Sequence, residues 1–406
     1  MNRRTFLVTA ATAGMARAQR GPQPAAGPES LPDPVRKLKP MIDGIQPITD
    51  DERRARIEKA RRLMHARGLS GMVLEGGTTL YYYTGTRNIG GLWILKPTGD
   101  PIWVLPEAQA PKFKGDVRAY SEAEGPYKKA AMAMRAGRIG IEERARFAVF
   151  DGLRQQMGAT AEFVSADPVT VACRVIKSKA ELALLQRAND ITIACYKAVF
   201  SCFREGMTQR DVSSLISAAY RQLGVQGNAM AIFGKYTAFP HGSVQPQQLR
   251  EGDVVLVDDG CSVEGYQSDI TRTIVFGKAT PRQKQIWDLE RKAQDAALAA
   301  ARVGATCESV DAAARKVITD AGFGPGYKVP GLPHRTGHGI GLDGHEWTNF
   351  VKGNRTKIQP GMCFSDEPTI AIYGEFGVRL EDCLYIAEDG PKMFTKQSPA
   401  IDQPFG

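Results

Sequence analysis

Residues 333–346, which read PHRTGHGIGLDGHE, decide how this 406-residue chain is interpreted. The stretch holds three of the five histidines of the chain, His334, His338 and His345, and a fourth, His241, precedes it. Its glycines permit a close approach of the backbone to a bound ligand. A lone histidine on an apolar strand is usually structural, but three in one glycine-rich segment predict a binding or catalytic site.

Two pairs of acidic residues flank this stretch. Asp258 closes an apolar strand and Asp269 begins the next strand. A turn at residues 262–265, where Gly265 can take a positive φ, would fold this hairpin about its middle. Residues that face each other across a hairpin have Cβ atoms about 4.5–5.5 Å apart. We therefore expect the two aspartates to lie opposite each other.

The same construction recurs downstream. Glu367 and Glu381 lie symmetrically about Gly374, which predicts a second hairpin with facing acids. Two hairpins of one design suggest an internal pseudo-twofold arrangement in which both acidic pairs meet. Separate acids at the ends of surface strands are the alternative, and for either pair alone that alternative is slightly favoured.

Four such carboxylates cannot all stay ionised without cations if they do meet. Like charges about 4 Å apart repel by roughly 4 kcal/mol at an effective dielectric near 20. An oxygen-rich set with one imidazole suits manganese, iron, cobalt or zinc, whereas calcium takes more oxygens and no histidine.

These residues together resemble the pita-bread metallopeptidases, the family of Xaa-Pro aminopeptidase, prolidase and methionine aminopeptidase. The resemblance spans roughly residues 175–395. The segments that carry it follow the family's order and spacing: 257–260 (VDDG), 265–273 (GYQSDITRT), 337–346 (GHGIGLDGHE), 366–368 (DEP) and 377–382 (GVRLED). The preceding region resembles the creatinase-type amino-terminal domain of prolidases, most clearly at residues 83–85 (YTG).

The resemblance implies a role for each candidate residue. Two divalent metal ions, manganese before cobalt, zinc or iron, would activate a bridging hydroxide and stabilise the oxyanion at the scissile carbonyl. The implied metal ligands are Asp258, Asp269, His338, Glu367 and Glu381. Glu367 would also relay a proton, His241 and His345 would act at the substrate carbonyl, His334 would line the site for the residue after the cut, and Arg379 would orient the acids.

Fold and domains follow from the same resemblance. The implied fold is α+β, a pita-bread catalytic domain at residues 173–400 preceded by a smaller α/β creatinase-type domain at residues 46–172. The sequence pattern agrees: a helix from about residue 50 leads into a strand, residues 93–96 and 101–105 form a hairpin, and long helices follow. We expect those helices at 180–203, 208–223, 281–302 and 306–321.

Two positions depart from the family pattern. Thr369 follows Pro368 where the family usually has glycine, and Asp366 stands where an apolar residue is usual before the glutamate. Neither change removes a ligand, so both are expected to alter the pocket wall and the substrate preference.

The first 45 residues predict export. Arg3 and Arg4 precede a short apolar run and a small-x-small cleavage pattern at residues 16–18, which is the order of a twin-arginine signal peptide over residues 1–20. The apolar run is too short to span a membrane, so no stable anchor is expected. Residues 21–45 read as a flexible linker. The protein would then be periplasmic or extracellular.

Bulk composition restricts the partners. The net charge of +9 comes from basic residues interleaved with acids and lacks a basic and aromatic stripe, so nucleic-acid binding is not expected. Seven cysteines form no C-x-x-C pair, and most are expected to be buried, with one disulfide possible on export.

The predicted function is hydrolysis of the amino-terminal bond of short peptides, with proline after the cut, by a homodimer. The alternatives are a creatinase-like carbon–nitrogen hydrolase acting on a small non-peptide substrate and a catalytically silent binding homologue. The choice between dipeptidase and aminopeptidase activity stays open, because it depends on how far the leading domain closes the cleft.

Overall fold

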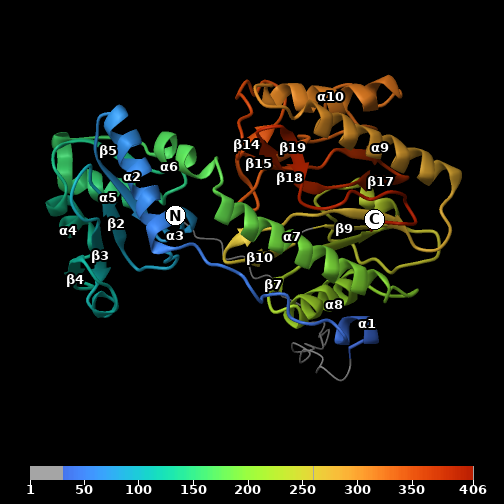
Figure 1. Cartoon of the computed structure of the whole chain (residues 1–406), viewed down its shortest axis with the longest axis horizontal. Helices are drawn as coiled ribbons and strands as arrows, with labels where there is room; N and C mark the ends of the chain where they lie inside the picture. Colours follow the sequence, from blue (N-terminus) through green and yellow to red (C-terminus); the bar gives the residue numbers. More distant parts are fainter. Residues whose placement is uncertain (1–30, 259, 406) are drawn as a thin grey trace, which may run out of the picture.

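The structure is a computed structural model that describes residues 31–258 and 260–405. The predicted signal peptide and the first part of the predicted linker lie outside the described residues. Two lobes make up the chain (Figure 1). The smaller lobe ends with α6 (Asp167–Arg174) and the larger begins with α7 (Lys179–Phe200), so the boundary predicted at residue 172 falls inside α6.

The smaller lobe is built on a six-stranded mixed sheet of order β4-β3-β2-β1-β5-β6. Its strands are β1 (Leu69–Glu75), β2 (Leu92–Leu95), β3 (Ile102–Pro106), β4 (Asp116–Tyr120), β5 (Gly137–Ile141) and β6 (Ala161–Ser165). Its remaining helices are α2 (Asp50–Ala66), α3 (Thr78–Thr84), α4 (Pro126–Ala133) and α5 (Phe147–Met157), with 3-10 turns η2 (Ala110–Lys112) and η3 (Gly158–Thr160). The antiparallel pair β2–β3 confirms the predicted hairpin, and α2 confirms the predicted helix.

Four long helices shape the larger lobe: α7, α8 (Gln209–Gln222), α9 (Pro281–Ala300) and α10 (Cys307–Asp320). They confirm the four predicted helical segments within a few residues. Capping boxes at Ser178, Thr208 and Thr280 begin α7, α8 and α9, because each side chain accepts from the third helical backbone N–H while that residue bonds back.

The strands of the larger lobe form four short sheets of order β12-β9-β8, β11-β10-β7, β14-β13-β15-β18-β19 and β16-β17. Their bounds are β7 (Gln226–Gly227), β8 (Met230–Phe233), β9 (Val254–Asp258), β10 (Cys261–Val263), β11 (Tyr266–Gln267), β12 (Arg272–Val275), β13 (Gly337–Gly339), β14 (Glu346–Phe350), β15 (Cys363–Asp366), β16 (Thr369–Ile372), β17 (Phe376–Arg379), β18 (Asp382–Ala387) and β19 (Gly390–Met393), with a 3-10 turn η4 (Gly234–Ala238). The strands lie between two helix layers, α9 and α10 on one side and α7 and α8 on the other (Figure 1).

One apolar core runs through both lobes. Met72 of β1 and Trp93 of β2 belong to the same buried cluster as Ile191 of α7 and Val257 of β9. A second cluster lies between the strands of the larger lobe and α9 with α10, and a third fills the other face of the smaller sheet.

A buried polar network fastens the lobes at the edge of this core. Arg56 of α2 donates to the Tyr82 carbonyl at 2.9 Å and to the Tyr266 hydroxyl at 3.2 Å. Tyr266 in turn donates to Glu181 of α7 at 2.8 Å. Because these groups are buried and bonded to each other, they fix the orientation of the smaller lobe over the larger one.

Residues 31–45 differ from the predicted flexible linker. They include a short helix, α1 (Asp33–Arg36), that packs against α7 and α8. Val35 is fully buried, and Met41 N–H donates to the Leu223 carbonyl at 2.9 Å. The apolar residues of this stretch, diluted by prolines and lysines, are sufficient to anchor it to the larger lobe.

All seven cysteines are free thiols, and six of them are buried, as expected from their apolar character. None of the helices within residues 31–258 and 260–405 is both long and apolar enough to cross a membrane.

Candidate metal centre

The first acidic hairpin turns where predicted but in a different register. Glu264 and Gly265 occupy the turn with φ of 48° and 83°. The pairing of Arg272 with Val257 continues to place Thr271, not Asp269, opposite Asp258. The prediction of facing aspartates was therefore wrong by two residues, because the turn is centred between Glu264 and Gly265 rather than before them.

Asp258 and Asp269 nevertheless meet. Asp269 lies between β11 and β12 and is not part of the strand pairing. Carboxylate oxygens of Asp258, Asp269 and Glu381 lie within 4.8 Å of one another. The strand ends therefore bring the acids together without direct cross-strand pairing.

The second hairpin is symmetric about Gly374 as predicted. Thr369 pairs with Arg379 in the β16–β17 ladder, and Asp366 pairs with Asp382 in the β15–β18 ladder. The two ladders have the same register. Glu367 and Glu381 lie between them, one on each side of the hairpin, at positions that correspond to each other.

His338 on β13 is the centre of the site. Its Nε2 lies 3.2 Å from Glu367 Oε1, 3.5 Å from Asp269 Oδ2 and 3.9 Å from Glu381 Oε1. The Nδ1 atom lies 3.0 Å from the Gly339 carbonyl, which can only accept, so Nδ1 carries the proton of the neutral ring. Burial holds the pKa of His338 well below its usual range. An Nε2 lone pair thus faces three carboxylates.

Thr271 and Arg379 organise the acids from behind. The Thr271 hydroxyl lies 2.6 Å from Asp258 Oδ1 and 2.7 Å from Glu381 Oε2, and it accepts from Arg379 Nε at 3.0 Å. Arg379 also pairs with Asp258 and donates to the Pro240 carbonyl. A hydroxyl has one proton, so it can satisfy only one of the two carboxylates at a time.

Burial of the two glutamates outweighs the positive charge beside them, which comes from Arg379 and Arg335 at Glu367 and from Arg379 at Glu381. Glu381 is 1% exposed, and its Oε1 has no hydrogen-bond partner there. Burial, and next the Asp269 carboxylate, raise the pKa of Glu381 well above its ordinary value. Burial raises the pKa of Glu367 to about 7. Ionisation of these two carboxyls is therefore unfavourable unless a cation is bound beside them.

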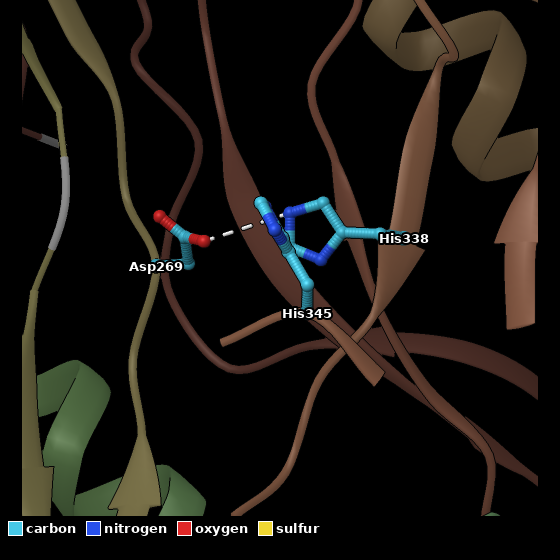
Figure 2. A group of neighbouring side chains, drawn as sticks. All are labelled: Asp269, His338 and His345. Carbon is cyan, nitrogen blue, oxygen red and sulfur yellow. Dashed lines mark ion pairs between the residues drawn. The ribbon is translucent and has the colours of Figure 1, made fainter. Parts of the chain in front are cut away.

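This donor set fits divalent cations. The groups Asp258, Asp269, Glu381 and His338, Glu367, Glu381 each offer ligand atoms within 4.8 Å of one another, and Glu381 belongs to both. Carboxylates with one imidazole suit manganese, cobalt, iron or zinc. A third group, Asp269, His338 and His345, overlaps them; Figure 2 shows the two imidazoles beside the Asp269 carboxylate.

A cavity of about 410 Å³ opens onto the acids. All nine residues predicted for the site line it: Asp258, Asp269, His338, Glu367, Glu381, His241, His334, His345 and Arg379. The His345 ring lies 4.1 Å from that of His338, centroid to centroid, and the His241 ring lies 6.2 Å from that of His334.

Several residues of the site escaped the sequence analysis. Tyr327, Arg335, Asn349 and Val351 also line the cavity. The Ser365 hydroxyl accepts from His338 N–H at 3.0 Å and donates to Glu367 at 3.3 Å. Thr271 lies inside a segment that carried the family resemblance and Arg335 inside the stretch 333–346, but an isolated threonine or arginine gives no local signal of its role.

The two departures from the family pattern have visible consequences. Thr369 Oγ1 lies 2.9 Å from His334 Nε2, so this threonine contacts a cavity-lining histidine. Asp366 is fully buried, and neither carboxyl oxygen has a hydrogen-bond partner in the described part of the chain. Burial raises the pKa of Asp366 well above its ordinary value, so ionising this carboxyl behind the site is unfavourable.

Comparison with protein families gives two adjoining matches. The model of metallopeptidase family M24 matches residues 183–388, and that of the creatinase/prolidase N-terminal domain matches residues 56–176. A Xaa-Pro dipeptidase from Lactobacillus delbrueckii subsp. lactis is 32% identical over 365 residues, covering 85% of this chain and 98% of the relative.

Solved structures agree. A dipeptidase from Mycobacterium ulcerans superposes with a TM-score of 0.79 at 30% identity, over 86% of this chain and 97% of that one. A prolidase from Thermococcus sibiricus gives a TM-score of 0.78 at 28% identity, over 84% and 96%. The predicted fold class, a pita-bread catalytic domain behind a creatinase-type domain, is confirmed. The creatinase-like and non-enzymatic alternatives are not favoured.

Proposed function

Because this chain belongs to metallopeptidase family M24, we propose that it hydrolyses the amino-terminal bond of short peptides with proline after the cut. The convergence of three carboxylates on the unprotonated Nε2 of His338 carries the proposal. The names of the similar dipeptidases and prolidases support the choice of substrate.

Asp258, Asp269, His338, Glu367 and Glu381 would hold two divalent cations, of which manganese is the proposed native metal. Such a pair lowers the pKa of a water and polarises the scissile carbonyl. The chain's own groups supply the rest. Glu367, whose carboxylate lies 3.2 Å from His338 Nε2, would receive the proton of the water and pass it to the departing amine.

The histidines at the rim act on the peptide. His345, exposed beside His338, contacts the substrate carbonyl as negative charge develops on its oxygen. His241, at the exposed edge of the cavity, contacts the same peptide unit. His334 forms part of the wall for the residue after the cut, and Arg379 holds Asp258 in place.

The test is hydrolysis of Ala-Pro and of a proline-free control, Ala-Ala, by purified protein with manganese and after chelation. We expect manganese-dependent release of alanine from Ala-Pro, faster than from Ala-Ala, and loss of activity in chelator. Full activity in chelator would contradict the proposal. Metal analysis of the purified protein should find about two ions per chain, which a metal-free hydrolase or a binding homologue would lack.

Export through the twin-arginine route is proposed on the basis of Arg3 and Arg4 alone. Replacing both with lysine should retain the protein in the cytoplasm of a bacterial host, as measured by fractionation. Appearance of that variant outside the cytoplasm at the wild-type level would exclude this route.

A homodimer is proposed as well. Light scattering of the purified protein at several concentrations should give twice the mass of one mature chain, and a concentration-independent monomer mass would refute it.

A further inference from the structure

His345 is held in the site by its backbone rather than by its ring. The imidazole is exposed and forms no hydrogen bond with the described part of the chain; its ring contact is with His338, at 4.1 Å between centroids (Figure 2). It lines both the metal-site cavity and a second cavity of about 510 Å³ at the junction of the two lobes. The position of this ring therefore depends on the turn that carries it, residues 341–346.

The carboxylate of Glu346 closes this turn. Its Oε1 accepts from the Leu342 N–H at 2.9 Å and from the Asp343 N–H at 3.3 Å, and its Oε2 accepts from Lys177 at 3.0 Å. Gly341 packs so closely against it that a Cβ there would lie 2.8 Å from the carboxylate. The Glu346 side chain is 5% exposed, and a carboxylate buried to this degree depends on its partners.

The smaller lobe supplies the other partners of the turn. Arg174, at the end of α6, pairs with Glu346 and lies 2.8 Å from Asp343 Oδ2. Thr78, the first residue of α3, donates to Asp343 Oδ1 at 2.7 Å. These two acids lie two residues before His345 and one residue after it. The turn is thus bonded to the smaller lobe on both sides of the histidine.

We propose that the smaller lobe positions His345 for catalysis, with Thr78 and Arg174 as positioning residues that act through Asp343 and Glu346. This inference rests on the proposed function, in which His345 contacts the substrate carbonyl. Misplacing a catalytic group by about 1 Å can slow a reaction about 100-fold. Because the oxyanion forms only in the transition state, loss of these bonds should lower kcat and leave KM nearly unchanged.

The experiment begins with Thr78→Val, which keeps the shape of the side chain and removes its hydroxyl. With Ala-Pro and manganese, kcat should fall about 10-fold while KM stays within about 2-fold, and Thr78→Ser should restore most of the turnover. Arg174→Lys keeps the charge and loses the fork that reaches both acids, so kcat should fall about 100-fold. Arg138→Met, on the exposed surface of the same lobe, is the control and should keep the wild-type kcat. An unchanged kcat in Thr78→Val would overturn the inference.

A double-mutant cycle separates positioning of His345 from a general structural role. His345→Gln removes the group to be positioned, so adding Thr78→Val to it should lower kcat by less than about 2-fold. A structural role would give the same 10-fold loss in both backgrounds, and that result would contradict the inference. Metal analysis should find wild-type metal content in both single variants, because the turn supplies none of the five proposed ligands.

Failure of the proposed function is distinguishable, because wild-type protein with manganese would then leave Ala-Pro intact. NMR of the histidine rings in metal-free protein tests the positioning even in that case. The His345 signal is assigned by its loss in His345→Gln. Thr78→Val should shift or broaden it and leave the signal of His65, on the exposed surface of α2, unchanged. An unmoved His345 signal would refute the inference.

Discussion

The two acidic hairpins of the larger lobe resemble each other in sequence and differ in their electrostatic state. In the first, Asp258 is held by Arg379 and faces the Thr271 hydroxyl. In the second, Glu367 and Glu381 are buried, and Glu381 Oε1 has no partner among the described residues. The first hairpin thus offers a ligand that is already neutralised. The second offers two buried carboxyls that are unfavourable to ionise in the metal-free site, so we expect metal affinity to depend mainly on it.

The largest effect is expected from Glu381→Gln. This residue belongs to both proposed ligand groups, so the amide should lower kcat/KM with Ala-Pro by about a thousandfold or more and reduce bound metal. In chelator the variant should be at least as stable as wild type, because a buried charge has been removed. Activity assays, metal analysis and thermal unfolding measure the three outcomes.

Glu388→Gln is its matched control, because Glu388 is an exposed acid just after β18. This control should change neither activity nor metal content. A Glu381→Gln protein with two bound metals and ordinary turnover would contradict the assigned ligand set.

A second effect concerns pH and metal-free stability. The folded pKa of Glu367 is about 7 against an ordinary 4.5, so the folded state binds this proton more tightly than the unfolded state. The contribution of protonated Glu367 to the free energy of unfolding is therefore fully present below about pH 4.5, and it is lost as the pH rises through 7. Relative to wild type, metal-free Glu367→Gln should gain up to about 3 kcal/mol between pH 4.5 and 8 in denaturant unfolding.

Asp258→Asn provides the contrast from the first hairpin. It should show no such gain, because removing this charge leaves Arg379 without its carboxylate. A comparable gain in both variants would remove the distinction between the hairpins.

A smaller effect is expected at the contact between the hairpins. Thr271→Val keeps the shape of the side chain and removes the hydroxyl that lies between Asp258 and Glu381. We expect a fall of about 10-fold in kcat/KM, equivalent to about 1.4 kcal/mol. Thr271→Ser retains the hydroxyl and should restore most of the activity. Equal losses in both variants would point to packing rather than to the hydrogen bonds.

The smallest effect is expected at Thr369. Thr369→Val removes the hydroxyl that contacts His334 Nε2, which should lower stability by about 1 kcal/mol and change KM more than kcat. Because the pKa of His334 is about 3, the pH profile above pH 5 should not move. A new ionisation near pH 6 in kcat/KM would show that the threonine is needed to keep this ring neutral.

Much of the fold was predictable because its signals are local. Apolar periodicity and start signals such as Ser178 and Thr280 identify the helices, and glycine-centred symmetry identifies the second hairpin. The register of the first hairpin was not predictable from residue counting. Its turn lies between Glu264 and Gly265, one residue later than the midpoint of the two aspartates.

The site was predictable to the extent that its residues carry unusual chemistry. Histidines and clustered acids are informative by type, so all nine predicted residues line one cavity. Thr271, Ser365 and Arg335 are informative only by position: their roles come from what lies beside them after folding. The packing of α1 was missed for the same reason, since Val35 is buried where α1 packs against α7 and α8.

The apolar core shared by the two lobes has a mechanical consequence. Because β1 and β2 pack into the same cluster as α7 and β9, cutting the chain between α6 and α7 would expose apolar surface of each fragment to water. The lobes should therefore melt in a single cooperative transition rather than one after the other. For the same reason, the smaller lobe is expected to keep a fixed orientation relative to the larger one.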